Sequence, residues 1–177
     1  MTVARSARST LLLLLLIFSL SLLSSSAAPP ALALDTGDKA PEFEAPLLGS
    51  ERTLKLKDQR GKVVYLDFWA SWCDPCKTAI PAIEKLRGEF PKEQFQVLAV
   101  NVDKDTKKAT KFLQKTPIGY PSVSDPRGKL PRLFGLETMP TSYLIDRNGV
   151  VRYVHKGFRE EDVAVLRKEI AKLVASR

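Results

Sequence analysis

The sequence has few residues that form disulfides or bind transition metals. Its 177 residues include two cysteines, Cys73 and Cys76, and one histidine, His155. These three side chains leave a tetrahedral zinc site without a fourth ligand. A disulfide between Cys73 and Cys76 would close a loop of a few residues, which constrains the unfolded chain little and makes a weak structural staple. The scarcity therefore favours a redox role for the cysteine pair over a structural one.

The N-terminal apolar run, Leu11–Leu23, is short for a membrane span. It follows Arg5 and Arg8 and precedes a stretch rich in Ser, Ala and Pro that contains Ala31-Leu32-Ala33, a small-x-small cleavage pattern. This three-part layout is typical of a secretory signal peptide. No cysteine lies near the run, which excludes a lipoprotein.

We therefore predict a signal peptide over residues 1–33 and one domain over residues 34–177, located outside the cytosol. If residues 24–28 extend the apolar run, the segment would instead stay on the chain as an uncleaved N-terminal anchor. A mature chain of this length is long enough to bury a sizeable core.

Positive charge exceeds negative charge, with a formal net charge of +8, but no basic block is interleaved with aromatic residues. We therefore expect no nucleic-acid partner. The lysines are scattered along the chain, which indicates a solvated basic surface. Recruitment of acidic partners or of anionic membrane surfaces is the alternative.

Apolar patterns with the periods of strands and helices alternate along the chain, without an internal repeat. Their order predicts an α/β fold: a central mixed β-sheet with a parallel core, helices on both faces and an N-terminal hairpin. The expected strands are near residues 43–48, 52–56, 63–68, 95–102, 120–124, 141–146 and 150–155. The expected helices cover residues 77–90 with a start near Asp74, and residues 105–115, 129–134 and 160–175. Residues 58–62 are expected to form a loop.

The stretch Val63–Pro81 places both cysteines where a buried strand passes into a helix. A helix N-terminus favours an anion, so Cys73 at the helix start is favoured as a thiolate, the form of cysteine that acts as a nucleophile. Cys76, three residues later, can close a small disulfide ring with it. This arrangement indicates thiol–disulfide exchange.

The sequence LDFWASWCDPCK at residues 66–77 resembles the active-site strand, turn and helix of thioredoxin-fold proteins. Residues 37–43, the segment RGKVV at residues 60–64 and MPTSYLIDRNG at residues 139–149 resemble the TlpA/ResA-type periplasmic thiol–disulfide oxidoreductases. The resemblance covers most of the mature chain. It implies a thioredoxin-like fold and a periplasmic location, and we expect a monomer without a cofactor or metal.

The resemblance assigns the attacking thiolate to Cys73 and the resolving thiol to Cys76, with a redox-active disulfide between them. Pro75 lacks an N–H and shapes the first helical turn. Asp74 places a negative charge beside Cys73, which disfavours the thiolate and favours a reductant over a strong oxidant. Lys77 is positioned to offset that charge.

Further site residues follow from the same resemblance. Asp67 stands in an apolar strand, where a carboxylate is costly unless it is paired or functional, and thioredoxin has a buried base at the matching position. We therefore predict that Asp67, with a pKa raised by desolvation, deprotonates Cys76; an aspartate at a strand edge facing water is the alternative. Pro140 matches the family's cis-proline and would turn the backbone of Met139 toward a substrate strand. Trp72 is expected to flank Cys73 as a contact surface.

One position departs from the family pattern. Many TlpA/ResA-type proteins have a glutamate three residues after the second cysteine, and this chain has Ala79 there. The role of that glutamate in proton transfer cannot be carried over, and Asp67 is the candidate to replace it. We expect Glu84, further along the same helix, to face solvent.

The resemblance implies protein thiol and disulfide substrates, such as the cysteines of apocytochrome c or of copper sites, and a membrane thiol-electron transporter as the source of electrons.

Three other functions are considered for the cysteine pair. A disulfide oxidase or isomerase is one alternative. A copper-binding metallochaperone using Cys73, Cys76 and His155 is another, although such proteins space their cysteines by three residues and His155 is expected to be a packed or surface residue. A peroxidase of the peroxiredoxin type needs a threonine and a proline before its peroxidatic cysteine. Ser71-Trp72 stands there instead, which argues against this function.

Overall fold

The computed structural model describes residues 33–176. The signal peptide predicted from the sequence lies outside the described residues, except for its last residue. Among the helices that the structure describes, none is both long and apolar enough to cross a membrane.

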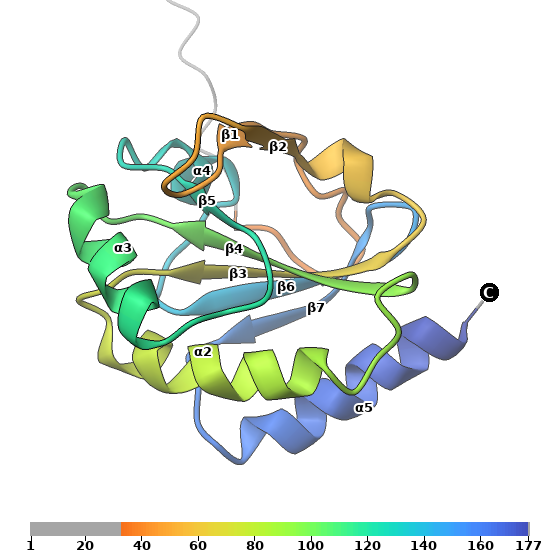
Figure 1. Cartoon of the computed structure of the whole chain (residues 1–177). Coiled ribbons are helices and arrows are strands. Elements are labelled where there is room, and N and C mark those ends of the chain that lie inside the picture. The colour runs from red at the N-terminus through yellow and green to blue at the C-terminus, as the bar shows by residue number, and fades with distance from the viewer. Residues whose placement is uncertain (1–32, 177) are drawn as a thin grey trace, which may run out of the picture. The chain divides into compact units, whose positions relative to one another are not determined.

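A five-stranded mixed sheet forms the centre of the domain, with the strand order β5-β4-β3-β6-β7 (Figure 1). β3 is parallel to β4, which is parallel to β5, whereas β6 is antiparallel to both β3 and β7. A separate two-stranded antiparallel sheet is formed by β1 and β2. The bounds are β1 (Glu44–Pro46), β2 (Thr53–Lys55), the 3-10 helix η1 (Leu56–Gln59), β3 (Val63–Trp69), α2 (Asp74–Arg87), β4 (Phe95–Asn101), α3 (Thr106–Lys115), β5 (Ser122–Ser124), α4 (Lys129–Leu133), β6 (Thr141–Ile145), β7 (Val151–Lys156) and α5 (Asp162–Ala175).

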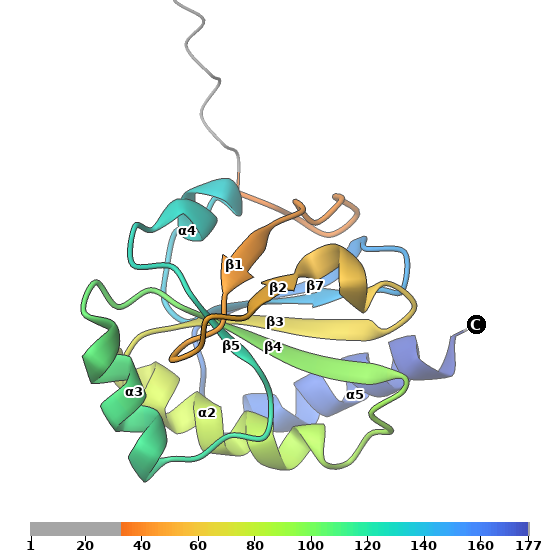
Figure 2. The same cartoon turned by 45° about the horizontal axis from the view of Figure 1, so that its top comes forward.

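The two faces of the central sheet are covered by different kinds of element. Helices α2, α3 and α5 lie on one side of the sheet, and the β1–β2 hairpin, η1 and α4 lie on the other (Figure 2). The core clusters agree, since one joins buried residues of α2, α3 and α5 to the sheet and the other joins those of the hairpin, η1 and α4. The predicted helices on both faces are therefore present, but α4 is short and shares its face with a hairpin.

β3 lies at the centre of the domain, and all seven of its residues are buried. Successive side chains of a strand point to opposite faces of the sheet. Tyr65 and Trp69 accordingly belong to the cluster beneath α2 and α5, whereas Leu66 and Phe68 belong to the cluster beneath the hairpin. Asp67 has the same parity as Tyr65 and Trp69, so it faces the helices, on the side where α2 begins.

The predicted element order and the mixed sheet are confirmed, and most boundaries differ by one or two residues. Residues 58–62, expected to be a loop, begin inside η1, which ends at Gln59. The helix expected to reach Phe90 ends at Arg87, and Gly88 forms its C-cap. Glycine favours helix ends because a glycine in a helix costs backbone entropy. The Asn148-Gly149 turn joins β6 to β7 as predicted, with Gly149 at a φ of 78°.

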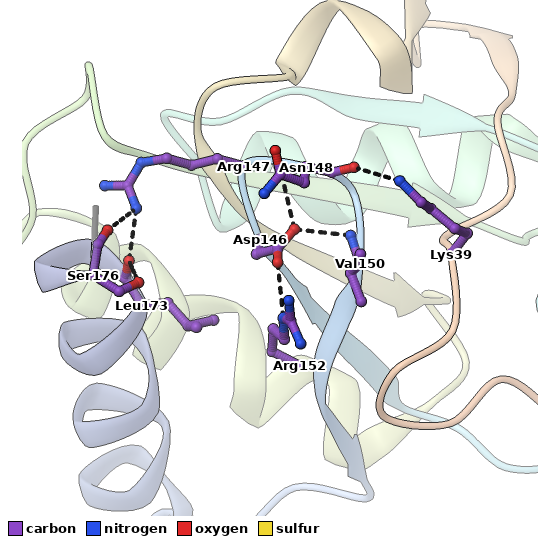
Figure 3. Close-up of polar contacts among 8 residues, drawn as sticks. All are labelled: Lys39, Asp146, Arg147, Asn148, Val150, Arg152, Leu173 and Ser176. Atoms are coloured by element: carbon purple, nitrogen blue, oxygen red, sulfur yellow. Dashed lines mark hydrogen bonds and ion pairs between the residues drawn. The ribbon is translucent and has the colours of Figure 1, made fainter.

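Arg147, in the turn after β6, holds the end of α5 against the sheet (Figure 3). Its Nη1 donates to the carbonyls of Leu173 at 2.8 Å and Ser176 at 2.7 Å, and its Nη2 donates to that of Val174 at 3.0 Å. The last carbonyls of a helix have no partner within the helix, so a cation supplying several donors satisfies them.

Replacing Arg147 with alanine is therefore expected to lower the free energy of unfolding by about 2 kcal/mol, because three carbonyls lose a charged donor. Urea unfolding of the two proteins measures this difference. Lys156→Ala, which removes an exposed ion pair with Glu137, serves as the control and should leave stability unchanged. Equal losses in both variants would contradict a special role for Arg147.

Candidate active site

Cys73 and Cys76 form a disulfide at the start of α2, with their Cα atoms 5.3 Å apart. Cys73 is the N-cap of the helix, and its Sγ accepts a hydrogen bond from the backbone N–H of Cys76 at 3.3 Å. Pro75 occupies the first turn, where its missing N–H costs no helical hydrogen bond. Cys73 is 5% exposed and Cys76 is fully buried, so Cys73 is the more accessible sulfur, as expected.

A buried carboxylate fixes the turn that carries the cysteines. Asp103 accepts hydrogen bonds from the backbone N–H of Ser71 at 2.8 Å and from the Ser71 hydroxyl at 2.7 Å. The side-chain amide of Asn101 donates to the same carboxylate at 2.7 Å. Asp103 was not predicted from the sequence. A sequence signal for it exists: Asp103 closely follows the apolar strand β4. Because β4 is parallel to β3, its C-terminal end lies beside the turn that follows β3.

Asp103→Ala is expected to lower the free energy of unfolding by about 3 kcal/mol, because the variant leaves the donors of Ser71 and Asn101 without their acceptor. Urea unfolding measures the loss. Asp105→Ala is the matched control two residues away: Asp105 caps α3 through the N–H of Lys107, and its loss should cost only about 1 kcal/mol. A smaller loss in Asp103→Ala than in Asp105→Ala would refute the anchoring role.

Asp67 lies in the middle of β3 and is 2% exposed, so the alternative of an aspartate facing water is wrong. Its Oδ1 accepts a hydrogen bond from Ser142 Oγ at 2.7 Å, whereas Oδ2 has no partner among the described residues. Desolvation by burial raises the pKa of Asp67 to about 7, and the Ser142 hydrogen bond partly opposes that rise. The direction and the cause are those expected from the sequence.

The surface around the disulfide is formed by Trp72 and Asp74. Trp72 is 63% exposed, in contrast to the buried Trp69. Asp74 is exposed and pairs with Lys77 at 2.7 Å. The hydrogen bond from Lys77 lowers the pKa of Asp74. Lys77 therefore partly neutralises the charge that Asp74 places beside Cys73.

Met139 and Pro140 lead into β6, the strand next to β3. The peptide bond between them is cis, as the resemblance implied. Pro140 is buried, and Met139 is half-buried against the core cluster that contains both cysteines. Met139 also packs against the cluster on the opposite face, so the Met139–Pro140 turn lies at the edge of the sheet where the two clusters meet.

Ala79 and Glu84 lie further along α2. Ala79 is 2% exposed, so the helix has no carboxylate at the family's glutamate position. The expectation that Glu84 faces solvent is wrong. Its carboxylate pairs with Arg87 at 2.7 Å and accepts the backbone N–H of Gly119 at 2.9 Å. Glu84 therefore links α2 to the loop before β5, since it binds Arg87 of its own helix and the N–H of Gly119 in that loop.

His155 is packed, as expected, at the end of β7. Its Nε2 lies 3.2 Å from Asp162 Oδ2, and its ring stacks on that of Tyr153. It borders a cleft of about 600 Å³ that Pro75 also lines. Within residues 33–176, no three His, Cys, Asp or Glu side chains gather where a metal ion could bind.

Comparison with known proteins places these features in a family. The model of the AhpC/TSA family matches residues 36–154. The thiol-disulfide oxidoreductase ResA of Geobacillus thermodenitrificans is 35% identical over 133 residues, which are 74% of this chain and 75% of ResA. ResA of Oceanobacillus iheyensis is 33% identical over 124 residues, which are 68% of this chain and 65% of that relative, just under two thirds of its length.

A solved structure gives the same result. The crystal structure of a Chlorobium tepidum protein assigned as the thiol:disulfide interchange protein DsbE is 46% identical in sequence. It superposes with a TM-score of 0.77 over 81% of this chain and 100% of that one. The fold is therefore thioredoxin-like, and the chain belongs to the AhpC/TSA family and, within it, to the ResA-like thiol–disulfide oxidoreductases.

Proposed function

We propose that this protein reduces disulfides of exported proteins, with Cys73 and Cys76 as its redox-active pair. The observation that carries the proposal is the position of the pair: a disulfide closed within one helical turn, whose first sulfur caps the helix and accepts the N–H of Cys76. A donor directed at Cys73 Sγ stabilises the thiolate when the pair is reduced.

The reaction has two steps. The Cys73 thiolate attacks a substrate disulfide, forming a mixed disulfide and releasing the first substrate sulfur. Asp67 takes the proton of Cys76, and the Cys76 thiolate then attacks Cys73, releasing the second substrate sulfur. Accessibility supports this order, since Cys73 is the more exposed of the two cysteines and Cys76, like Asp67, is buried.

The substrate surface is assigned to Trp72, Asp74 and Pro75 on one side and to Met139 and Pro140 on the other. The exposure of Trp72 supports this assignment. Among the described residues, neither the N–H nor the C=O of Met139 has a backbone hydrogen-bond partner. Both groups are free to pair with an extended substrate segment, as in strand addition.

The family and the charge of Asp74 beside Cys73 support the reductant direction, and Lys77 moderates the effect of that charge. We expect a reduction potential well below that of a strong oxidant such as DsbA, about −120 mV. Equilibration with glutathione or dithiothreitol buffers, followed by thiol counting, measures it. A value near the DsbA potential would support the oxidase alternative instead.

Electrons must reach a reductant outside the cytosol, so a membrane thiol-electron transporter is the proposed donor. The predicted signal peptide supports export, either as a cleaved segment or as an anchor. Substrate classes implied by the family are apocytochrome c and copper-site proteins. Cys76→Ser, which stalls the mixed disulfide on Cys73, followed by identification of trapped proteins by mass spectrometry, tests these classes. A trap that captures no exported cysteine-containing protein would count against the proposal.

A further inference from the structure

Two buried hydroxyl groups form a hydrogen-bonded chain that ends on Asp67. The hydroxyl of Tyr65 donates to Ser142 Oγ at 2.8 Å, and Ser142 Oγ donates to Asp67 Oδ1 at 2.7 Å. Each of the three residues is 2% exposed. Burying a polar group is costly unless it is hydrogen-bonded, and this chain gives both hydroxyls a partner.

Strand register explains how residues so far apart in sequence meet. In the antiparallel pair of β3 and β6, Asp67 stands opposite Ser142 and Tyr65 stands opposite Leu144. Residues opposite one another in a sheet share a face. Ser142 also follows Pro140 by two residues, so one strand supplies both the Met139–Pro140 turn and the donor to Asp67.

We propose that Ser142, supported by Tyr65, is a positioning residue that determines which oxygen of Asp67 exchanges the proton. The Ser142 hydroxyl occupies Oδ1, which leaves Oδ2 to receive the proton of Cys76. Oδ2 is buried and has no partner among the described residues, as this role requires. The inference rests on the function proposed above and extends it to two further residues.

The second step of the reaction moves one proton and one electron pair in sequence. The Cys76 thiol gives its proton to Asp67 Oδ2, and an electron pair of the Cys76 sulfur forms the bond to Cys73. The bond between Cys73 and the substrate sulfur breaks, and its electron pair leaves on the substrate thiolate. The cysteine pair is oxidised, the substrate is reduced, and Asp67 is neutral until its proton passes to solvent.

The hydroxyl chain also stabilises the ionised form of Asp67. A hydrogen bond donated to a carboxylate favours the charged state, so the chain opposes the rise in pKa that burial causes. The other titratable side chains that interact electrostatically with Asp67 are those of Tyr65 and Tyr120. Burial raises the pKa of both tyrosines well above the usual value, so both stay neutral across the working range. The hydrogen bond from Ser142 is therefore the side-chain contact whose removal should change the pKa of Asp67.

The experiment is a carboxyl-carbon NMR titration of Asp67 in the full protein, paired with the pH profile of mixed-disulfide resolution. Ser142→Ala should raise the pKa of Asp67 by about one, a tenfold change in proton affinity. Resolution should then slow about fivefold near pH 7, because fewer Asp67 side chains are ionised, and should recover by about pH 9. Tyr65→Phe, which keeps the serine, should shift both measurements in the same direction by less.

Tyr143→Phe is the matched control. Tyr143 is the next residue of β6 and donates a buried hydrogen bond to the carbonyl of Phe134 on the opposite face. It should leave the pKa of Asp67 unchanged. An unchanged pKa in both Ser142→Ala and Tyr65→Phe, or equal slowing at every pH, would overturn the positioning role. Absence of exchange in the unmodified protein at any pH would instead reject the proposed function, while the titration still decides the inference about Ser142.

Discussion

Replacing Cys73 with serine is expected to abolish reduction of protein disulfides, because the variant lacks the thiolate that makes the first attack. Catalysed exchange should fall to the background rate of the buffer thiol. Cys76→Ser should behave differently, since Cys73 still attacks but the mixed disulfide persists. Reduction of a model disulfide protein, followed by non-reducing electrophoresis, distinguishes these outcomes.

The two cysteine variants differ because the two sulfurs differ in position. Cys73 lies at the N-cap of α2 and is slightly exposed, whereas Cys76 is fully buried one turn along. Ser71→Ala provides a control that alters the same turn without removing a sulfur, and it should retain exchange. If Cys73→Ser rather than Cys76→Ser accumulated the mixed disulfide, the assigned order of attack would be reversed.

Asp67→Asn is expected to slow resolution of the mixed disulfide on the order of a hundredfold near pH 7, because Cys76 loses its proton acceptor. First attack by Cys73 should remain largely intact. Stopped-flow measurement of the two phases separates them. The deficit should shrink above about pH 9, where free thiols ionise without help. Equal slowing of both phases would argue against Asp67 as the base for Cys76.

The same variant should make the fold more stable at alkaline pH. The folded protein holds the proton of Asp67 up to a pKa of about 7, whereas the unfolded chain releases it near 3.8. Because the folded state binds more protons between these values, stability contributed by this group falls as pH rises from about 4 to 7. A neutral asparagine side chain carries no such cost, so Asp67→Asn should gain roughly 2–4 kcal/mol at pH 8, a gain that disappears below about pH 4. Urea unfolding of the oxidised proteins at both pH values measures it.

Asp67 thus combines a cost to stability with a proposed gain in function. A fully buried carboxylate that is ionised at the working pH destabilises the fold. Its presence in a strand whose residues are all buried is explained if it transfers a proton there. A loss of stability in Asp67→Asn at pH 8 would show that the carboxylate is held for structural reasons instead.

Much of the fold follows from local patterns in the sequence. The apolar run of β3, the Asn148-Gly149 turn and the helical spacing of Leu166 and Ile170 each depend on neighbours close in the chain. Such patterns report backbone propensity and the face that must be buried, which are properties of short segments. The cysteine pair is local in the same way, since both sulfurs lie within one turn of α2.

The sequence was enough to predict the element order, the mixed sheet and the position of the cysteines at a helix start, and it favoured a buried Asp67 over one facing water. Only the tertiary structure decided which distant groups complete the site: Ser142 and Tyr65 around Asp67, Asp103 beneath Ser71, and Gly119 on Glu84. These contacts depend on strand register and on which loops meet at the edge of the sheet. A local sequence pattern does not carry that information. Each of these contacts joins two distant segments, and the folding of the intervening chain decides whether they meet.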